Sequence, residues 1–156
     1  MNDLFEDFLR ILNAFEQHEV DYVLVGGFAV MLHGMERLTR DIDIFVKNSP
    51  ENIANVREAL RMVFHDEAIA EITSDELKKY SVIRYGTPKE FYVDIMTQLG
   101  DAVAYENLAH EVIEYEGVRI KLATPETLYR LKRDTVRERD KYDAQFLQAL
   151  IQSRKS

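Results

Sequence analysis

Two short stretches near the start of the chain decide how the rest is interpreted. Residues 25–29 read Val-Gly-Gly-Phe-Ala, and residues 41–46 read Asp-Ile-Asp-Ile-Phe-Val. The second stretch is rich in β-branched and aromatic residues and alternates acidic with apolar residues, which is typical of a strand. Because successive side chains of a strand point to opposite faces, Asp41 and Asp43 share one face with their Cα atoms ~7 Å apart. The isoleucine after each of them faces the core.

Two carboxylates at one end of a strand repel each other and lose hydration, so the pair is stable mainly when a cation joins it. A third acid, Asp94, lies inside the apolar run 91–96 (Phe-Tyr-Val-Asp-Ile-Met), where an unpaired charge is unfavourable. Three carboxylates suit Mg²⁺, with Mn²⁺ as a substitute, when water and phosphate oxygens complete the coordination. The alternative for Asp41 and Asp43 is the solvated face of an edge strand.

The glycine pair Gly26-Gly27 ends an apolar strand expected at 21–25 and precedes a short helix expected at 28–33. Glycines at such a junction let backbone N–H groups approach a phosphate, although glycine pairs are also common in ordinary turns. Arg37 and Thr39 stand just before the acidic strand and form a mixed-charge cluster beside the glycines.

Composition limits the class of protein. A chain of 156 residues that is 46% hydrophobic predicts one domain spanning 1–156. The absence of cysteine excludes disulfides, thiolate metal sites and a cysteine nucleophile. We find no membrane-spanning stretch and no secretory signal, and we expect a cytoplasmic protein. The net charge of −8 argues against a protein that coats nucleic acid, but it permits a local basic patch.

The predicted fold class is α+β, with one mixed sheet flanked by helices and with helices at the C-terminal end. Apolar residues at three- and four-residue spacing predict the helices, alternating apolar runs predict the strands, and Glu116-Gly117 marks a hairpin. Thr124 is expected to cap the helix that Pro125 opens. Helices are predicted at 3–18, 28–33, 50–64, 101–109, 125–136 and 140–153, a helical turn at 74–77, and strands at 21–25, 41–46, 81–85, 91–96, 112–115 and 118–122.

These motifs resemble the nucleotidyltransferase superfamily typified by DNA polymerase beta, which carries a glycine turn, an acid-x-acid strand and a third acid. The more similar branch contains abortive-infection-type toxin nucleotidyltransferases and small related proteins. Its pattern looks like Gly-Gly-x-Ala, His-Gly and Arg-x-Thr-x-Asp-Ile-Asp-Ile, which stand here at 26–29, 33–34 and 37–44. The stretches 131–132 (Leu-Lys) and 139–143 (Arg-Asp-x-x-Asp) resemble the branch's lysine-bearing helix and its Lys-Asp-x-x-Asp helix start.

By this resemblance Asp41 and Asp43 would ligate metal, and Asp94 would help bind the catalytic ion and activate the attacking hydroxyl. Gly26 and Gly27 would hold the triphosphate. Gly27 departs from the serine found in many members, so backbone contacts must replace a hydroxyl there. Because the chain is short, we expect it to be without the further domain with which larger members bind their acceptor.

Arg37 and Thr39 are further candidates for nucleotide binding. Lys132 is the candidate for a phosphate contact from the C-terminal helices, and its alternative is a solvated lysine in a charged helix. Asp140 is expected to cap the last helix, or to orient Lys132 or Arg139, which stands where the branch has lysine.

The sequence therefore predicts an Mg²⁺-dependent nucleotidyltransferase that moves a nucleoside monophosphate from an NTP to a hydroxyl and releases pyrophosphate. A tRNA or other RNA end, a protein side chain and a small molecule such as an antibiotic are the candidate acceptors. A partner protein of a toxin–antitoxin pair is expected from the resemblance, and no membrane partner is expected. The alternative is a nucleotide-binding or antitoxin-like regulatory module that keeps this fold without turnover.

Overall fold

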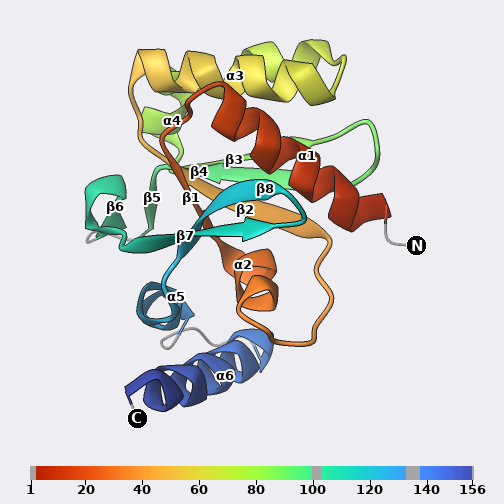
Figure 1. The fold of residues 1–156 in the computed structure, drawn as a ribbon. Helices are drawn as coiled ribbons and strands as arrows, with labels where there is room; N and C mark the ends of the chain where they lie inside the picture. The colour runs from red at the N-terminus through yellow and green to blue at the C-terminus, as the bar shows by residue number, and fades with distance from the viewer. Residues whose placement is uncertain (1–2, 100–102, 133–137, 156) are drawn as a thin grey trace.

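The computed structural model describes residues 3–99, 103–132 and 138–155, and Figure 1 labels its main elements. The helices are α1 (Asp3–Gln17), α2 (Gly26–Leu32), α3 (Pro50–Val63), α4 (Ser74–Lys79), α5 (Pro125–Lys132) and α6 (Glu138–Lys155), with 3-10 turns η1 (Glu67–Glu71) and η2 (Tyr105–Asn107). The strands are β1 (Tyr22–Val25), β2 (Asp41–Val46), β3 (Val82–Gly86), β4 (Tyr92–Met96), β5 (Gln98–Leu99), β6 (Val103–Ala104), β7 (His110–Tyr115) and β8 (Val118–Ala123).

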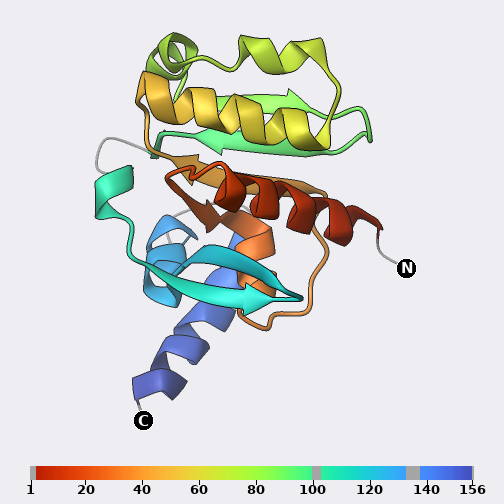
Figure 2. The ribbon, with the colours of Figure 1, turned by 45° about the horizontal axis from the view of Figure 1, so that its top comes forward.

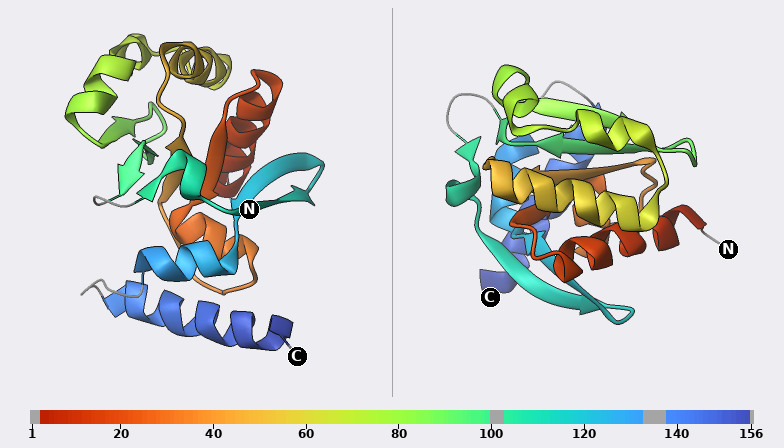
Figure 3. Two further views of the ribbon diagram at one scale, coloured as in Figure 1. Left: turned by 90° about the vertical axis from the view of Figure 1, so that its left-hand side faces the viewer. Right: turned by 90° about the horizontal axis from the view of Figure 1, so that it is seen from above.

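A six-stranded mixed sheet in the order β3-β4-β2-β1-β8-β7 forms the centre of the fold. β2 runs parallel to β4 and β1 runs parallel to β8, whereas the other neighbouring strands are antiparallel. Figures 1 and 2 show α1 and α3 on one side of the sheet and α2, α5 and α6 on the other. The left view of Figure 3 shows α5 lying against α6.

The face of the sheet under α1 and α3 carries much of the hydrophobic core. α1 is amphipathic, and its buried Phe8 ring packs 5.0 Å from Phe28 and 5.4 Å from Phe91, measured between ring centroids. From β2, Ile42 and Ile44 are fully buried, as the alternation of that strand predicts. The opposite face of β2 is therefore left for its two aspartates.

Asn52 of α3 links the start of β1 to the end of β2, the strand that carries Asp41 and Asp43. Its side-chain oxygen accepts from the Asp21 N–H at 2.8 Å, and its amide donates to the carbonyls of Asp21 at 3.0 Å and Lys47 at 2.8 Å. Ser49 caps the same helix by accepting from the Asn52 N–H at 3.1 Å. This buried amide thus fixes where β1 begins and where β2 ends.

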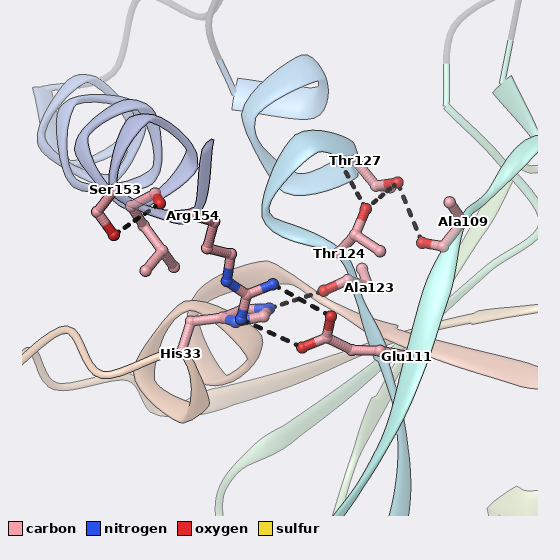
Figure 4. A network of polar contacts seen from close by, with 9 residues as sticks. His33, Ala109, Glu111, Ala123, Thr124, Thr127, Ser153 and Arg154 are labelled. Carbon is pink, nitrogen blue, oxygen red and sulfur yellow. Dashed lines mark hydrogen bonds and ion pairs between the residues drawn. The ribbon is translucent and has the colours of Figure 1, made fainter. Parts of the chain in front are cut away.

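Polar contacts hold the C-terminal helices to the β7–β8 hairpin (Figure 4). Arg154 of α6 pairs with Glu111 of β7 at 3.2 Å, and Thr127 of α5 donates to the Ala109 carbonyl at 3.1 Å. A ring nitrogen of His33, just after α2, lies 2.8 Å from the Ala123 carbonyl, so this histidine packs against the end of β8. The three helices are therefore anchored around one end of the sheet.

The α+β prediction and nearly all its elements are confirmed. The solvated-edge interpretation of the acidic strand is wrong, because β2 lies between β4 and β1. The two glycines open α2 instead of preceding it. The helix predicted at 101–109 is wrong over 103–109: residues 103–107 form β6 and η2, where pairing with β5 outweighs local helix preference, and residues 108–109 have no regular secondary structure. The remainder of that prediction at 101–102, and the predicted helix over 133–136, lie outside the described residues.

Among the described residues, no helix combines the length and the apolar character needed to span a lipid bilayer.

Replacing Asn52 with alanine is expected to lower the free energy of unfolding by about 1–3 kcal/mol, because the Asp21 N–H and the Lys47 carbonyl lose their hydrogen bonds to this buried side chain. Urea unfolding followed by circular dichroism measures the change. Asn13→Ala, an exposed change on α1, is the control and should alter stability by less than about 0.5 kcal/mol. Equal effects of the two substitutions would contradict the role assigned to Asn52.

Candidate active site

Four residues form a row straight across neighbouring strands. The register pairs Val25 of β1 with Asp43 of β2, Asp43 with Asp94 of β4, and Asp94 with Arg84 of β3. Neighbouring strands lie about 4.8 Å apart, so the carboxylates of Asp43 and Asp94 are forced together on one face. Asp41, two residues before Asp43, joins them there. The structure thus brings together the three acids that the sequence predicts.

This crowding shifts the protonation of Asp43. Burial, repulsion from Asp94, a hydrogen bond with Asp94 and repulsion from Asp41 raise the pKa of Asp43 from 3.8 to about 7, and the nearby Lys132 opposes the rise. Without a further cation, Asp43 therefore keeps its proton up to nearly neutral pH.

Arg84 is the cation that the structure places on these acids, and its local sequence does not mark it as a site residue. Its Nε donates to Asp94 at 3.0 Å, and its Nη2 donates to Asp41 at 2.9 Å and to Asp94 at 3.3 Å. Its guanidinium also lies 4.2 Å from the ring centroid of Tyr92. Asp94 raises the pKa of Arg84 further above its usual range. Alternation in the strand predicted at 81–85 could have placed Arg84 on a polar face, but not opposite Asp94.

The three carboxylates fit a divalent cation in chemistry, since they are hard oxygen donors that repel one another. In the described part of the chain, however, no three acidic or histidine side chains already surround a common point suited to a metal ion. Arg84 instead bridges Asp41 and Asp94. A metal ion at this place must therefore compete with the guanidinium.

The two glycines make room for charged neighbours. Gly26 has φ +76°, and a Cβ atom there would lie 2.0 Å from a carboxylate oxygen of Asp43. A Cβ atom on Gly27 would lie 3.0 Å from a guanidinium nitrogen of Arg37 and 3.3 Å from the hydroxyl of Thr39. Gly26 thus lets Asp43 approach β1, and Gly27 keeps Arg37 and Thr39 close to the acidic strand.

Lys132 enters from α5 and is buried. Its Nζ lies 3.0 Å from Asp140 and 2.9 Å from Asp143, and its side chain is only 11% exposed. Arg37 also pairs with Asp143, so one carboxylate joins the loop before β2 to both C-terminal helices. The interpretations of Lys132 as a solvated lysine and of Asp140 as a helix cap are wrong: α6 already begins at Glu138, and Asp140 orients Lys132.

These side chains surround a cleft of about 920 Å³. All the predicted site residues except Gly26 line it, so the cleft gathers Gly27, Arg37, Thr39, Asp41, Asp43, Asp94 and Lys132. Exposed Leu38, Val82 and Tyr92 add apolar surface at its lining. Acids that suit a metal ion and cations that suit phosphate oxygens thus line one cavity.

Asp43→Asn is expected to stabilise the metal-free protein at pH 8 and to leave it unchanged near pH 4. The folded state binds the Asp43 proton more tightly than the unfolded state, so wild type loses stability as the pH rises from about 4 to about 7. Asparagine removes this loss, which is at most about 4 kcal/mol because one pKa unit corresponds to about 1.4 kcal/mol. Thermal unfolding in the presence of EDTA across this pH range measures it.

The matched control is Glu114→Gln, which removes a carboxylate from an exposed position on β7. Its stability difference from wild type should change far less over this pH range than that of Asp43→Asn, because residue 114 is exposed and lies outside the acidic cluster of the cleft. If the stability difference between Asp43→Asn and wild type does not change with pH, the carboxylates do not repel one another as described.

Solved structures share this fold at low sequence identity. The lincosamide antibiotic adenylyltransferase LnuA, in its lincomycin-bound structure, has a TM-score of 0.65 and 21% identity over 92% of this chain and 95% of its own. ANT(2")-Ia in complex with adenylyl-2"-tobramycin has a TM-score of 0.60 and 12% identity over 95% and 89%. An antigenic nucleotidyltransferase-like protein from Paracoccidioides brasiliensis has a TM-score of 0.52 and 15% identity over 91% and 76%.

In sequence, no curated protein matches the chain. A family model does match: that of the nucleotidyl transferase AbiEii toxin of type IV toxin–antitoxin systems, over residues 7–153. The match covers both the acidic strands and the C-terminal helices that supply Lys132. The chain therefore belongs to the AbiEii nucleotidyltransferase toxin family.

Proposed function

We propose that this protein is a divalent-metal-dependent enzyme that transfers a nucleoside monophosphate from an NTP to a hydroxyl group and releases pyrophosphate. The observation that carries the proposal is the placement of Asp41, Asp43 and Asp94 on one face of the sheet, at a cleft that is also lined by cations. Family membership supports nucleotidyl transfer in general.

Asp41, Asp43 and Asp94 are the residues that would hold Mg²⁺, or Mn²⁺ in its place. A metal ion bound there would neutralise phosphate charge and lower the pKa of the attacking hydroxyl. Gly26 and Gly27 would hold the triphosphate through their backbone, and Gly27 already lies at the cleft surface.

In the proposed reaction the acceptor oxygen attacks the α-phosphorus, and the bond from this phosphorus to the bridging oxygen of pyrophosphate breaks. Asp94 takes up the proton of the hydroxyl. Lys132, Arg37 and Thr39 bind phosphate oxygens and stabilise the charge that develops on the leaving group. Since Asp143 holds both Lys132 and Arg37, these two cations are positioned before the substrate enters.

The acceptor we propose is a single accessible hydroxyl on an RNA end, a protein or a small molecule. Two structural neighbours are described as an adenylyltransferase of lincosamide antibiotics and as a complex with adenylylated tobramycin, so this fold accommodates small acceptors. The net charge of −8 disfavours a long nucleic-acid footprint, which leaves a tRNA only its end as a point of contact.

Wild-type protein incubated with Mg²⁺, each α-³²P-labelled NTP in turn and a total cell lysate is expected to label one RNA, protein or small-molecule species and to release pyrophosphate. Asp43→Asn should lower this transfer by about a hundredfold or more, because it removes a charge from the proposed metal site. Glu114→Gln should retain wild-type transfer.

Each outcome distinguishes the candidate functions. Label that depends on Asp43 identifies the nucleotide and the acceptor class together. If no label appears and Mg²⁺ with an NTP still protects the fold against thermal unfolding, the chain is the non-catalytic nucleotide-binding module. If there is neither label nor protection, nucleotide chemistry is not its function.

We further propose that an antitoxin partner counteracts the enzyme, as the description of its family as the toxin of a type IV toxin–antitoxin system suggests. Induced expression of the wild type in a bacterial host should then slow growth, whereas Asp43→Asn expressed at the same level should not. Growth curves with immunoblots for expression level measure the difference. Equal slowing by both proteins would separate toxicity from nucleotidyl transfer.

A further inference from the structure

Arg84 differs from an ordinary surface ion pair because its guanidinium binds two carboxylates at once. One guanidinium donates to both oxygens of Asp94 and also reaches Asp41, so it satisfies two of the three carboxylates at once. The acids themselves are less accessible than the arginine: the Asp94 side chain is 13% exposed and the Arg84 side chain is 53% exposed. The guanidinium therefore covers the acidic cluster from the solvent side.

Two further cations of the cleft, Lys132 and Arg37, pair with other acids. Lys132 is paired with Asp140 and Asp143, and Arg37 is paired with Asp143, all through carboxylates that are almost fully buried. Arg84 stands on β3, the edge strand of the sheet, and its long side chain can leave the acids without any movement of the strand. Among these three cations, Arg84 is the one whose partners are the proposed metal ligands.

A divalent cation held by all three acids competes with Arg84 for both oxygens of Asp94 and for Oδ2 of Asp41. A metal ion that arrives alone must therefore break three charge-assisted hydrogen bonds and leave the guanidinium stacked only on Tyr92. A metal ion that arrives with a triphosphate brings phosphate oxygens, which match the planar fork of an arginine as well as a carboxylate does.

We propose that Arg84 is an exchangeable counter-ion of this site: it neutralises Asp41 and Asp94 before substrate arrives and transfers to phosphate oxygens of the incoming metal–nucleotide complex. The inference rests on the proposed function, because it needs a metal ion and a nucleotide to bind here. Its consequence is that metal and nucleotide bind best together. Arg84 opposes binding of the metal alone and favours binding of the complex.

The test is Arg84→Gln, with the Kd for Mn²⁺ alone and the Kd for a non-hydrolysable NTP analogue at saturating Mn²⁺ both measured by calorimetry. We expect the variant to bind Mn²⁺ alone about tenfold more tightly and the Mn²⁺–nucleotide complex about tenfold more weakly, each equivalent to about 1.4 kcal/mol. Arg84→Lys keeps the charge without the fork and should lie between wild type and Arg84→Gln in both measurements. The control is Arg61→Gln, which removes an exposed arginine paired with Glu58 on α3 and should change neither Kd.

The opposite signs distinguish this inference from a structural role of Arg84. Arg84→Gln could instead weaken both binding reactions, strengthen both or leave both unchanged. Each of these results would contradict the proposed exchange of Arg84, even though metal and nucleotide bind. If neither wild type nor the variant binds Mn²⁺ or the nucleotide, while both unfold cooperatively on heating, the proposed function fails and the inference fails with it.

Discussion

The parallel pairing of β2 with β4 is the constraint on which the rest of the site depends. It sets Asp43 beside Asp94 in register. The two strands cannot shift to separate the acids, because their opposite side is fully buried. The buried side chains there are Ile42 and Ile44 of β2 and Val93 and Ile95 of β4. A slip of one residue would turn these apolar side chains to the solvent and the acids into the core. The hydrophobic face thus holds a repulsive pair in place.

The residues around the carboxylates offset this repulsion in two different ways. Lys132 is locked among buried acids and acts on Asp43 from a fixed position, and Gly26 provides the space that Asp43 needs. Arg84, in contrast, is half exposed and pairs directly with two of the acids. One group of charges is preorganised and the other is free to exchange, a division that suits a site that receives a metal ion and a polyphosphate together.

The fold and the site are predictable from the sequence where the pattern of neighbouring residues is sufficient. The alternation around Asp41 and Asp43 predicts a strand and its inner face from six residues, and Asp94 stands out because its neighbours are apolar. Arg84 could not be found in this way, since its role follows from the pairing of β3 with β4 and not from its own neighbours. Likewise the burial of Lys132 depends on carboxylates of another helix, so a charged helix and a structured ion network have the same local pattern.

The distribution of charge reconciles an acidic protein with an anionic substrate. The chain as a whole carries −8, yet the cleft wall gathers cations, among them Lys132, Arg37, Arg40 and Arg139. Over distances beyond the Debye length of about 8 Å an exposed charge is largely screened, so a small polyphosphate inside the cleft interacts mainly with its lining. A long nucleic acid would also lie along the acidic exterior. This distribution of charge supports the proposed acceptor, one that inserts an end into the cleft, over one that spreads across the surface.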